Sequence, residues 1–314
     1  MFEITLIVVA AVFIIMGFIS GNKLFELTIN PKADRSTIAK APHNVVDVSE
    51  RSPIEIEIDQ VWWTKVDRQE LIMTSYDNLK LHAYRVTNEN PNDLWMICVH
   101  GYTSNATQSI PFARRFYEKN YNIIMPNLRG HGQSEGDYFG MGWTDRMDII
   151  YWINFIIQQN PQAKIALFGI SMGGSTVMMT AGEPLPNNVF AVINDCGYSS
   201  VWAEFSYQVK LLYNLPNVPI LNFVSIITKI RAGYFLEEAN AIRQIKKTQL
   251  PILFIHGEKD TFVPSDMAEK LYQASAGEKD KMIVKNAGHG QSALLAGEAY
   301  WDKVFAFLNK YHEF

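Results

Sequence analysis

The stretch KIALFGISMGGS, residues 164–175, decides the fold because it turns directly from an apolar strand into a helix. Gly169, Ser171 and Gly173 form the pattern G-x-S-x-G at this turn, and a helical run, STVMMTA, follows them. A serine on so tight a turn projects its hydroxyl above the sheet, and the glycines leave space for the turn to close. The pattern therefore predicts a nucleophilic serine, Ser171, at the end of a strand.

Short apolar runs alternate with helical patterns on both sides of this turn. The first two runs flank Asp77 and Asn78, which predicts a hairpin. Apolar residues recur at helical spacing within residues 143–157 and again within 300–311. This alternation predicts the α/β class, with a mostly parallel sheet and helices on both of its faces. The predicted strands are QELIMTS, LKLHAYRV, LWMICV, NIIMP, KIALFG, FAVIND, PILFIHG and KMIVKN.

One connection, between the runs FAVIND and PILFIHG, is much longer than the others. Its apolar residues recur at helical spacing, so we expect residues 198–249 to form a helical cap inserted late in the sheet. Open α/β sheets bind ligands at the carboxyl ends of their strands, where this connection begins. We therefore expect the cap to cover the site, with Trp202 and Phe205 facing the substrate. The alternative is that these residues pack the cap's own core.

A serine hydroxyl becomes a good nucleophile only when a base takes its proton. His289, in the run NAGHG, follows the last apolar strand and so lies on a loop at the same edge of the sheet as Ser171. A carboxylate must hold the imidazole in the correct tautomer, and Asp260 follows the strand PILFIHG directly. Asp195, which ends the strand FAVIND, is the alternative acid.

Several motifs in this order resemble the α/β-hydrolase superfamily, in particular membrane-anchored bacterial serine hydrolases of the esterase and serine-aminopeptidase-like group. The resemblance covers about residues 65–311 and implies the chain order nucleophile, acid, base for Ser171, Asp260 and His289. It also implies an oxyanion hole made by the backbone N–H groups of Tyr102 and Met172. The motifs are HGYTSN (100–105), NLRGHGQSEG (127–136), GISMGG (169–174), HGEKDTFVP (256–264) and NAGHG (286–290).

The resemblance and the triad together predict hydrolysis of a carboxylic ester through an acyl-enzyme on Ser171. A peptidase or acyltransferase using the same triad is an alternative. A peptidase acting on free N-termini needs an acidic clamp for the amine, for which the cap offers Glu204, Glu237 and Glu238. A non-catalytic binding protein on the same fold is a further alternative, but such a protein is expected to have lost a triad member. Neither H-E-x-x-H nor C-x-x-C occurs, so we expect no cofactor and no metal.

We expect the run NLRGHGQSEG to have a structural role in a loop rather than a catalytic role. We expect Arg129 to hold a loop through backbone carbonyls, with Asp137 or Asp145 as its partner. His100 and His131 are both followed by glycine, and we expect them to shape loops.

The first residues predict a single-pass membrane anchor. Residues 4–19 read ITLIVVAAVFIIMGFI, and the stretch 1–21 is close to the length that spans a bilayer as a helix. No basic residue precedes the run, which favours a retained anchor over a cleaved signal peptide. A buried core helix is the other alternative, but core helices rarely need so long an unbroken apolar stretch. We expect a juxtamembrane connector at 22–60 and an α/β-hydrolase domain at 61–314. The basic residues that follow the run predict a cytoplasmic domain by the positive-inside rule; they are Lys23, Lys32, Arg35 and Lys40.

The composition fits this organisation. The chain of 314 residues is 48% hydrophobic, enough for a large core, and its formal net charge of -4 gives no sign of the basic surface typical of nucleic-acid-binding domains. Cys98 and Cys196 lie in apolar runs, so we expect buried thiols rather than a disulfide. The expected partners are a small-molecule ester or acyl substrate and, through the first helix, the lipid bilayer of the cell membrane.

Overall fold

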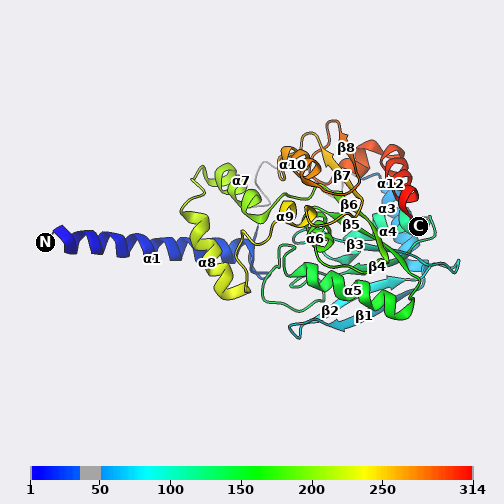
Figure 1. Cartoon of the computed structure of the whole chain (residues 1–314), viewed down its shortest axis with the longest axis horizontal. Coiled ribbons are helices and arrows are strands. Elements are labelled where there is room, and N and C mark those ends of the chain that lie inside the picture. Colours follow the sequence, from blue (N-terminus) through cyan, green and yellow to red (C-terminus); the bar gives the residue numbers. More distant parts are fainter. Residues whose placement is uncertain (1, 36–50, 313–314) are drawn as a thin grey trace.

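The computed structural model describes residues 2–35 and 51–312. Figure 1 shows a long helix, α1 (Phe2–Thr28), that projects from a body built around a sheet, with a small group of helices beside it. The sheet has the strand order β1-β2-β4-β3-β5-β6-β7-β8. The pairs β1–β2 and β2–β4 are antiparallel, and every other neighbouring pair is parallel. The predicted α/β class with a mostly parallel sheet is therefore confirmed.

Each predicted apolar run forms a strand. The opening hairpin turns at Asn78, whose φ of 66° is a conformation that asparagine tolerates better than most residues. The middle strands are buried along nearly their whole length, as expected where helices cover both faces. The strands are β1 (Arg68–Thr74), β2 (Lys80–Val86), β3 (Leu94–Val99), β4 (Asn122–Pro126), β5 (Lys164–Ile170), β6 (Val189–Asp195), β7 (Ile252–Gly257) and β8 (Lys279–Val284).

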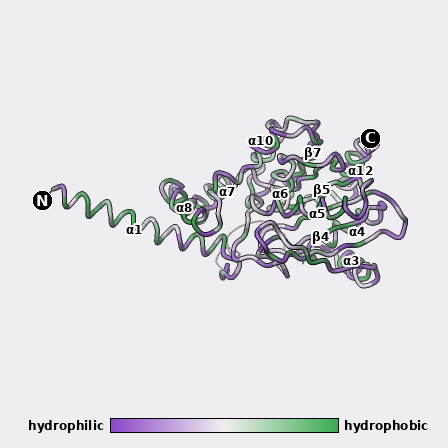
Figure 2. Tube along the Cα trace, turned by 60° about the horizontal axis from the view of Figure 1, so that its bottom comes forward, coloured by the Kyte–Doolittle hydropathy of each residue, from purple (hydrophilic) through white to green (hydrophobic). Residues whose placement is uncertain are grey.

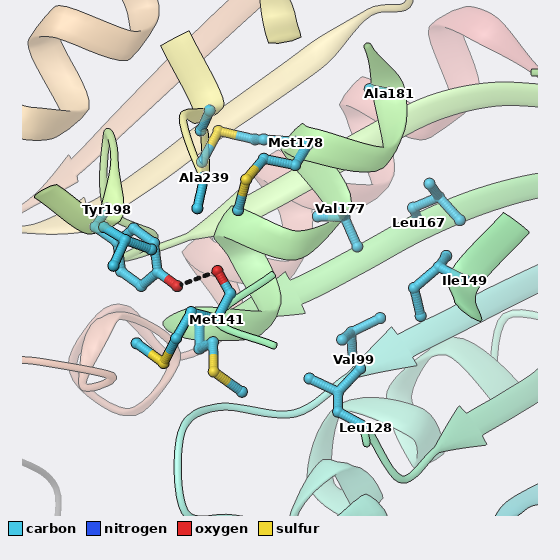
Figure 3. Close-up of a cluster of buried hydrophobic side chains, with 14 of the residues drawn as sticks. Val99, Leu128, Met141, Ile149, Leu167, Val177, Met178, Ala181, Tyr198 and Ala239 are labelled. Carbon is cyan, nitrogen blue, oxygen red and sulfur yellow. Dashed lines mark hydrogen bonds between the residues drawn. The ribbon is translucent and has the colours of Figure 1, made fainter. Parts of the chain in front are cut away.

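Helices cover the two faces of the sheet and bury a separate apolar cluster on each. One cluster involves α5 (Asp145–Gln159), α6 (Met172–Ala181) and α10 (Asp266–Ala274). Figure 3 shows part of it, where Val99 and Leu167 of the sheet lie close to Ile149 and Val177 of these helices. The other cluster involves α3 (Pro53–Lys65), α4 (Ile110–Tyr117) and α12 (Glu298–Tyr311). The shorter helices η2 (Ala106–Ser109) and α11 (Ser292–Ala296) lie in loops next to the carboxyl ends of the strands.

The long connection between β6 and β7 forms a helical cap, as predicted for residues 198–249. It contains α7 (Val201–Tyr213), α8 (Ile220–Ala232) and α9 (Ala241–Ile245). Figure 1 shows α7 and α8 on the side of the body from which α1 projects. The cap is therefore the part of the domain next to the first helix.

The first helix is longer than the predicted anchor. It continues past residue 21 to Thr28, and α3 occupies another part of the predicted connector 22–60; residues 36–50 of that connector lie outside the described residues. The first part of α1 is apolar, as its green colour in Figure 2 shows, and its large apolar side chains are exposed. The helix is long and apolar enough to cross a membrane. Phe25 and Ile29, near its end, are buried in the core of the domain. This burial explains why the helix continues through the polar residues around Lys23.

Two glycines let α1 and α8 approach closely. A Cβ atom at Gly17 would lie 2.2 Å from the ring of Phe223, and one at Gly21 would lie 2.9 Å from Phe223 Cβ. Small residues at such spacing are typical of close helix–helix contacts. The ring of Phe18 packs edge-on against the same phenylalanine. The cap therefore packs directly on the proposed anchor helix.

The expectation for Arg129 was wrong. Its buried guanidinium donates to both carboxylate oxygens of Asp148, at 2.8 and 2.7 Å, and to Asp77 at 2.7 Å, rather than to backbone carbonyls, Asp137 or Asp145. Asp148 lies in the first turn of α5 and Asp77 in the opening hairpin, two elements whose approach only the tertiary fold determines. The two thiols are buried and free, as predicted.

Candidate active site

The turn after β5 holds Ser171 in a strained conformation. Its φ of 56° and ψ of -122° lie outside the regions that residues with a side chain normally adopt. Its N–H donates to Asp195 O at 2.8 Å. The neighbouring glycines are required sterically, because a Cβ at Gly173 would lie 2.1 Å from Val99 O and one at Gly169 would lie 2.2 Å from Gly173 O. The backbone packing thus fixes where the serine hydroxyl stands.

Three side chains from three strand ends meet at this hydroxyl. His289 Nε2 lies 2.8 Å from Ser171 Oγ, and His289 Nδ1 lies 2.7 Å from Asp260 Oδ2. Asp260 follows β7, and His289 lies on the loop after β8. With Nδ1–H donating to the carboxylate, Nε2 is left as the acceptor for the serine proton. The structure therefore brings together the three residues that the sequence predicted as a triad.

Asp260 is held as a carboxylate by its surroundings. Its Oδ1 accepts hydrogen bonds from the N–H groups of Phe262 at 2.9 Å and Val263 at 2.8 Å. Burial opposes its ionisation, but His289 and the hydrogen bonds from His256 and His289 keep the pKa of Asp260 well below its ordinary value. The acid is thus ionised wherever a histidine base can work.

His256 is a contributor that the sequence reasoning missed. It is completely buried, and its Nε2 lies 3.2 Å from Asp260 Oδ2 and 2.9 Å from Val263 O. It therefore contacts the same oxygen of Asp260 as His289 does and helps to hold the carboxylate in place. The available signal was its place at the end of the apolar strand PILFIHG, four residues before the predicted acid.

Asp195, the alternative acid, has a different partner. Its carboxylate accepts a hydrogen bond from the Tyr300 hydroxyl at 2.9 Å, while its backbone carbonyl accepts the Ser171 N–H. Burial raises the pKa of Asp195 to about 6. Asp260, and not Asp195, is the carboxylate hydrogen-bonded to His289. Asp195 instead contacts the turn that carries the serine.

The two backbone N–H groups expected to form an oxyanion hole flank Ser171. Met172 is the first residue of α6, where N–H groups have no intrahelical acceptor. Tyr102 lies on the loop after β3, and a Cβ at the preceding Gly101 would lie 3.4 Å from Ser171 Cβ. His100 shapes this loop, since its Nε2 accepts the N–H of Leu128 at 3.0 Å and its Nδ1 lies 2.8 Å from Gly101 O. Burial lowers the pKa of His100 to about 4, so its ring is neutral near neutral pH.

Ser171 borders two cavities of different character. One, of about 80 Å³, is lined mostly by apolar side chains from α1, the cap and the loops around Ser171. The other, of about 570 Å³, has a mixed lining, in which charged side chains and His289 lie beside apolar ones such as Phe112 and Trp301. Of the two residues expected to face the substrate, Phe205 lines the apolar cavity, but Trp202 lines neither of these two cavities. Trp202 is near the start of α7, where it packs against the core of the domain instead.

A metal is a poor fit to the residues around the triad. Cys196, Asp260 and His289 place their potential ligand atoms within 4.8 Å of one another. Burial keeps the pKa of the Cys196 thiol well above its ordinary value, so it resists forming the thiolate that binds metals. The Asp260 and His289 atoms concerned already bind each other. The group is better suited to proton transfer.

Comparisons with known proteins assign the superfamily. A family model described as alpha/beta hydrolase fold matches residues 95–216, and one described as serine hydrolase (FSH1) matches residues 216–290. The chain belongs to the α/β-hydrolase superfamily, and its fold is that of a serine hydrolase.

Individual relatives and solved structures are consistent with this assignment. The chain is 26% identical to Bacillus subtilis YqkD, over 91% of this chain and 90% of that protein. It is 22% identical to the Saccharomyces cerevisiae membrane protein YNL320W, over 76% of this chain and 79% of that one. The Pyrococcus furiosus esterase Pf2001 superposes with a TM-score of 0.65 at 20% identity, over 87% of this chain and 98% of the esterase. An acylaminoacyl peptidase from Pyrococcus horikoshii has a TM-score of 0.61 at 18% identity, over 81% of this chain and 44% of the peptidase.

The steric reason for Gly173 can be tested directly. We expect Gly173→Ala to lower the free energy of unfolding by about 1–3 kcal/mol, because the new methyl group would press on the Val99 carbonyl, which belongs to the sheet and cannot move aside. Gly101→Ala is the matched control, since its methyl group would make contacts of 3.4 Å or longer. Urea denaturation monitored by circular dichroism measures both. Equal stability of the two variants would refute the steric account.

Proposed function

We propose that the protein hydrolyses a carboxylic ester through an acyl-enzyme on Ser171. Ser171 is the nucleophile, His289 the general base and acid, and Asp260 the carboxylate that orients the imidazole. The observation that carries the proposal is the chain of two hydrogen bonds, 2.8 Å from Ser171 Oγ to His289 and 2.7 Å from His289 to Asp260. The backbone N–H groups of Tyr102 and Met172 stabilise the oxyanion.

The reaction proceeds in two halves. As Ser171 Oγ attacks the ester carbonyl, its proton moves to His289 Nε2, and the oxyanion forms facing the two N–H donors. The C–O bond to the alcohol then breaks, and His289 returns the proton to the leaving oxygen. A water molecule next loses a proton to His289 and attacks the acyl carbonyl. The carboxylic acid leaves, and Ser171 recovers its proton.

An ester suits the site better than a peptide with a free N-terminus. Glu204 is the only carboxylate among the described residues lining the apolar cavity, but it is 4% exposed, and burial raises its pKa to about 8. It is therefore mostly neutral at pH 7 and lacks the negative charge that an ammonium group requires. Glu237 accepts a hydrogen bond from Ser225, and Glu238 pairs with Lys229 within the cap. The apolar walls favour an apolar acyl group instead.

We also propose that α1 anchors the enzyme in the cell membrane, with the hydrolase domain on the cytoplasmic side. Twenty residues of helix span about 30 Å, the thickness of the hydrocarbon layer. The apolar side chains of residues 4–16 are exposed, which is costly in water but favourable in lipid. Among the described residues, Lys23, Lys32 and Arg35 follow the span and support the cytoplasmic orientation; Lys40 lies outside the described residues.

The assignment of the nucleophile predicts covalent labelling. A small alkyl fluorophosphonate should modify Ser171, and peptide mapping by mass spectrometry should locate the adduct on the peptide that contains GISMGG. Ser171→Ala should lose both the adduct and p-nitrophenyl butyrate hydrolysis. Full hydrolysis by the alanine variant, with an adduct elsewhere, would falsify the assignment.

The choice of acid predicts an asymmetry between two carboxylates. Asp260→Asn should lower kcat by orders of magnitude, up to about 10⁴-fold as for the serine-protease acid, because the amide favours the wrong imidazole tautomer. Asp195→Asn is the matched control and should cost far less, because Tyr300 can still donate to the amide oxygen. Circular dichroism checks that both variants fold. A larger loss in Asp195→Asn would overturn the choice.

The membrane proposal predicts an integral protein. The full chain should remain in the membrane fraction after carbonate extraction, because only lipid covers the exposed apolar side chains of α1. Protease should digest the hydrolase domain in inside-out membrane vesicles but leave it intact in right-side-out vesicles. Release by carbonate would contradict the anchor, and the opposite protease pattern would contradict the orientation.

A further inference from the structure

The end of α1 forms a wall of the apolar cavity beside Ser171. Leu24, Leu27 and Thr28 lie on one face of the helix, at spacings of three and four residues, and all three line the cavity that Ser171 and Met172 also border. The opposite wall comes from the cap. Its lining residues on α7 and α8 include Phe205, Val209, Leu212, Leu221 and Val224. An acyl group attached to Ser171 would therefore lie between the first helix and the cap.

This position of α1 is fixed by specific contacts. The Tyr102 hydroxyl donates to Thr28 O at 2.6 Å, which ties the end of the helix to the loop expected to carry an oxyanion donor. The N–H of Phe139 donates to Ile29 O at 2.8 Å. Arg231 of α8 lies over the Phe25 ring and pairs with Glu26. The end of α1 is therefore part of the hydrolase domain.

The cavity reaches the surface where α1 would leave the bilayer. Leu24 and Leu212 are partly exposed, and Tyr213, which also lines the cavity, is 45% exposed. Leu24 follows the predicted span by three residues, a rise of about 4.5 Å along the helix. The cap, which lies beside α1 in Figure 1, exposes further apolar side chains; they are Leu211, Leu215, Val218, Ile226 and Ile230. Such a surface next to a membrane-spanning helix suits contact with the lipid interface.

The larger cavity brings charged groups to the other side of Ser171, among a lining that also contains apolar side chains. Arg35, Arg114, Arg115 and Glu298 are among its lining residues. Arg114 pairs with Asp59 and Arg115 with Glu298, so these two arginines are neutralised by carboxylates. A substrate lying across Ser171 would thus have a narrow apolar cavity on one side and, on the other, a wider cavity that also offers charged groups to a polar alcohol.

We propose that α1 is both the anchor and a wall of the acyl pocket, and that the enzyme takes a single-chain amphiphilic ester directly from the bilayer. The acyl chain enters between Leu24, Leu27 and the end of α7, and the polar alcohol occupies the larger cavity. The narrow apolar cavity selects one unbranched chain. This inference rests on the proposed esterase function and adds the substrate class and its route of entry.

The first test introduces a larger side chain on α1 that would fill part of the proposed acyl pocket. The full chain in detergent micelles is assayed with p-nitrophenyl acetate, butyrate, octanoate, laurate and palmitate. Leu27→Trp, and independently Leu24→Trp, should lower the laurate-to-acetate ratio of kcat/KM at least about tenfold, because each methylene that loses its pocket costs roughly fourfold. Ile14→Trp is the matched control, since Ile14 is exposed on the same helix, and it should keep the parent ratio.

The outcomes separate the two proposals. A variant that is labelled by the fluorophosphonate at the parent rate retains a folded active site. The chain-length ratio is interpreted only for pocket variants that meet this criterion, and one of the two is sufficient. A parent-like chain-length ratio in such a variant would overturn the pocket inference while leaving the esterase function intact. Parent-like hydrolysis by Ser171→Ala would instead overturn the proposed function.

The second test concerns the route of entry. The full chain is reconstituted in phosphatidylcholine vesicles, and p-nitrophenyl palmitate is placed either in the same vesicles or in separate ones. A palmitoyl chain leaves a bilayer slowly, because each buried methylene raises its partition constant into the bilayer by about a factor of four. We expect at least about tenfold faster hydrolysis when enzyme and ester share a bilayer. Equal rates from separate vesicles, with detergent activity intact, would refute entry from the bilayer.

Discussion

The backbone turn at Ser171 is the constraint on which the rest of the site depends. A residue with a side chain is held there at a φ of 56°, a conformation that costs about 1–3 kcal/mol and persists only when the surroundings impose it. They impose it through the close packing around Gly169 and Gly173, where an added Cβ would clash with neighbouring carbonyls, and through the hydrogen bond from Ser171 N–H to Asp195 O. The loops that follow the carboxyl ends of β7 and β8 place Asp260 and His289 beside this turn. The acid, base and nucleophile meet because parallel strands end at one edge of the sheet.

Much of this fold could be predicted because its signals are local. Buried parallel strands have continuous apolar runs, and the turn after KIALF carries its own steric signature in its glycines. The triad could be predicted for the same reason, since each member directly follows a recognisable strand. His256 was missed because its role depends on the direction in which one side chain points, toward Asp260, rather than on any sequence pattern. Arg129 was given the wrong partners because Asp77 and Asp148 are brought to it by elements far apart in the sequence.

The least predictable feature was the second role of the first helix. Its apolar run explains a membrane span, but hydropathy cannot say that Leu24, Leu27 and Thr28 line a cavity with Ser171. That placement depends on Gly17 and Gly21, whose lack of a side chain leaves space for Phe223 of the cap. It also depends on the hydrogen bond between Tyr102 and Thr28. Phe205 lines the cavity and Trp202 does not, although both lie in the apolar pattern of α7. The packing of α7 on its neighbours, and not its apolar period alone, determines which of its residues line the cavity. In this account the anchor and the acyl pocket are one structural unit.

The most direct test is a photocrosslink from the active site. A fluorophosphonate with a long alkyl chain and a photoreactive diazirine near its end is bound to the full chain in vesicles, irradiated and mapped by mass spectrometry. The account predicts that the reagent phosphonylates Ser171 and crosslinks to the peptide of α1 containing Leu24, Leu27 and Thr28, or to α7 across the cavity from it. Crosslinks confined to the arginine-lined cavity, or the absence of an adduct on Ser171, would contradict it.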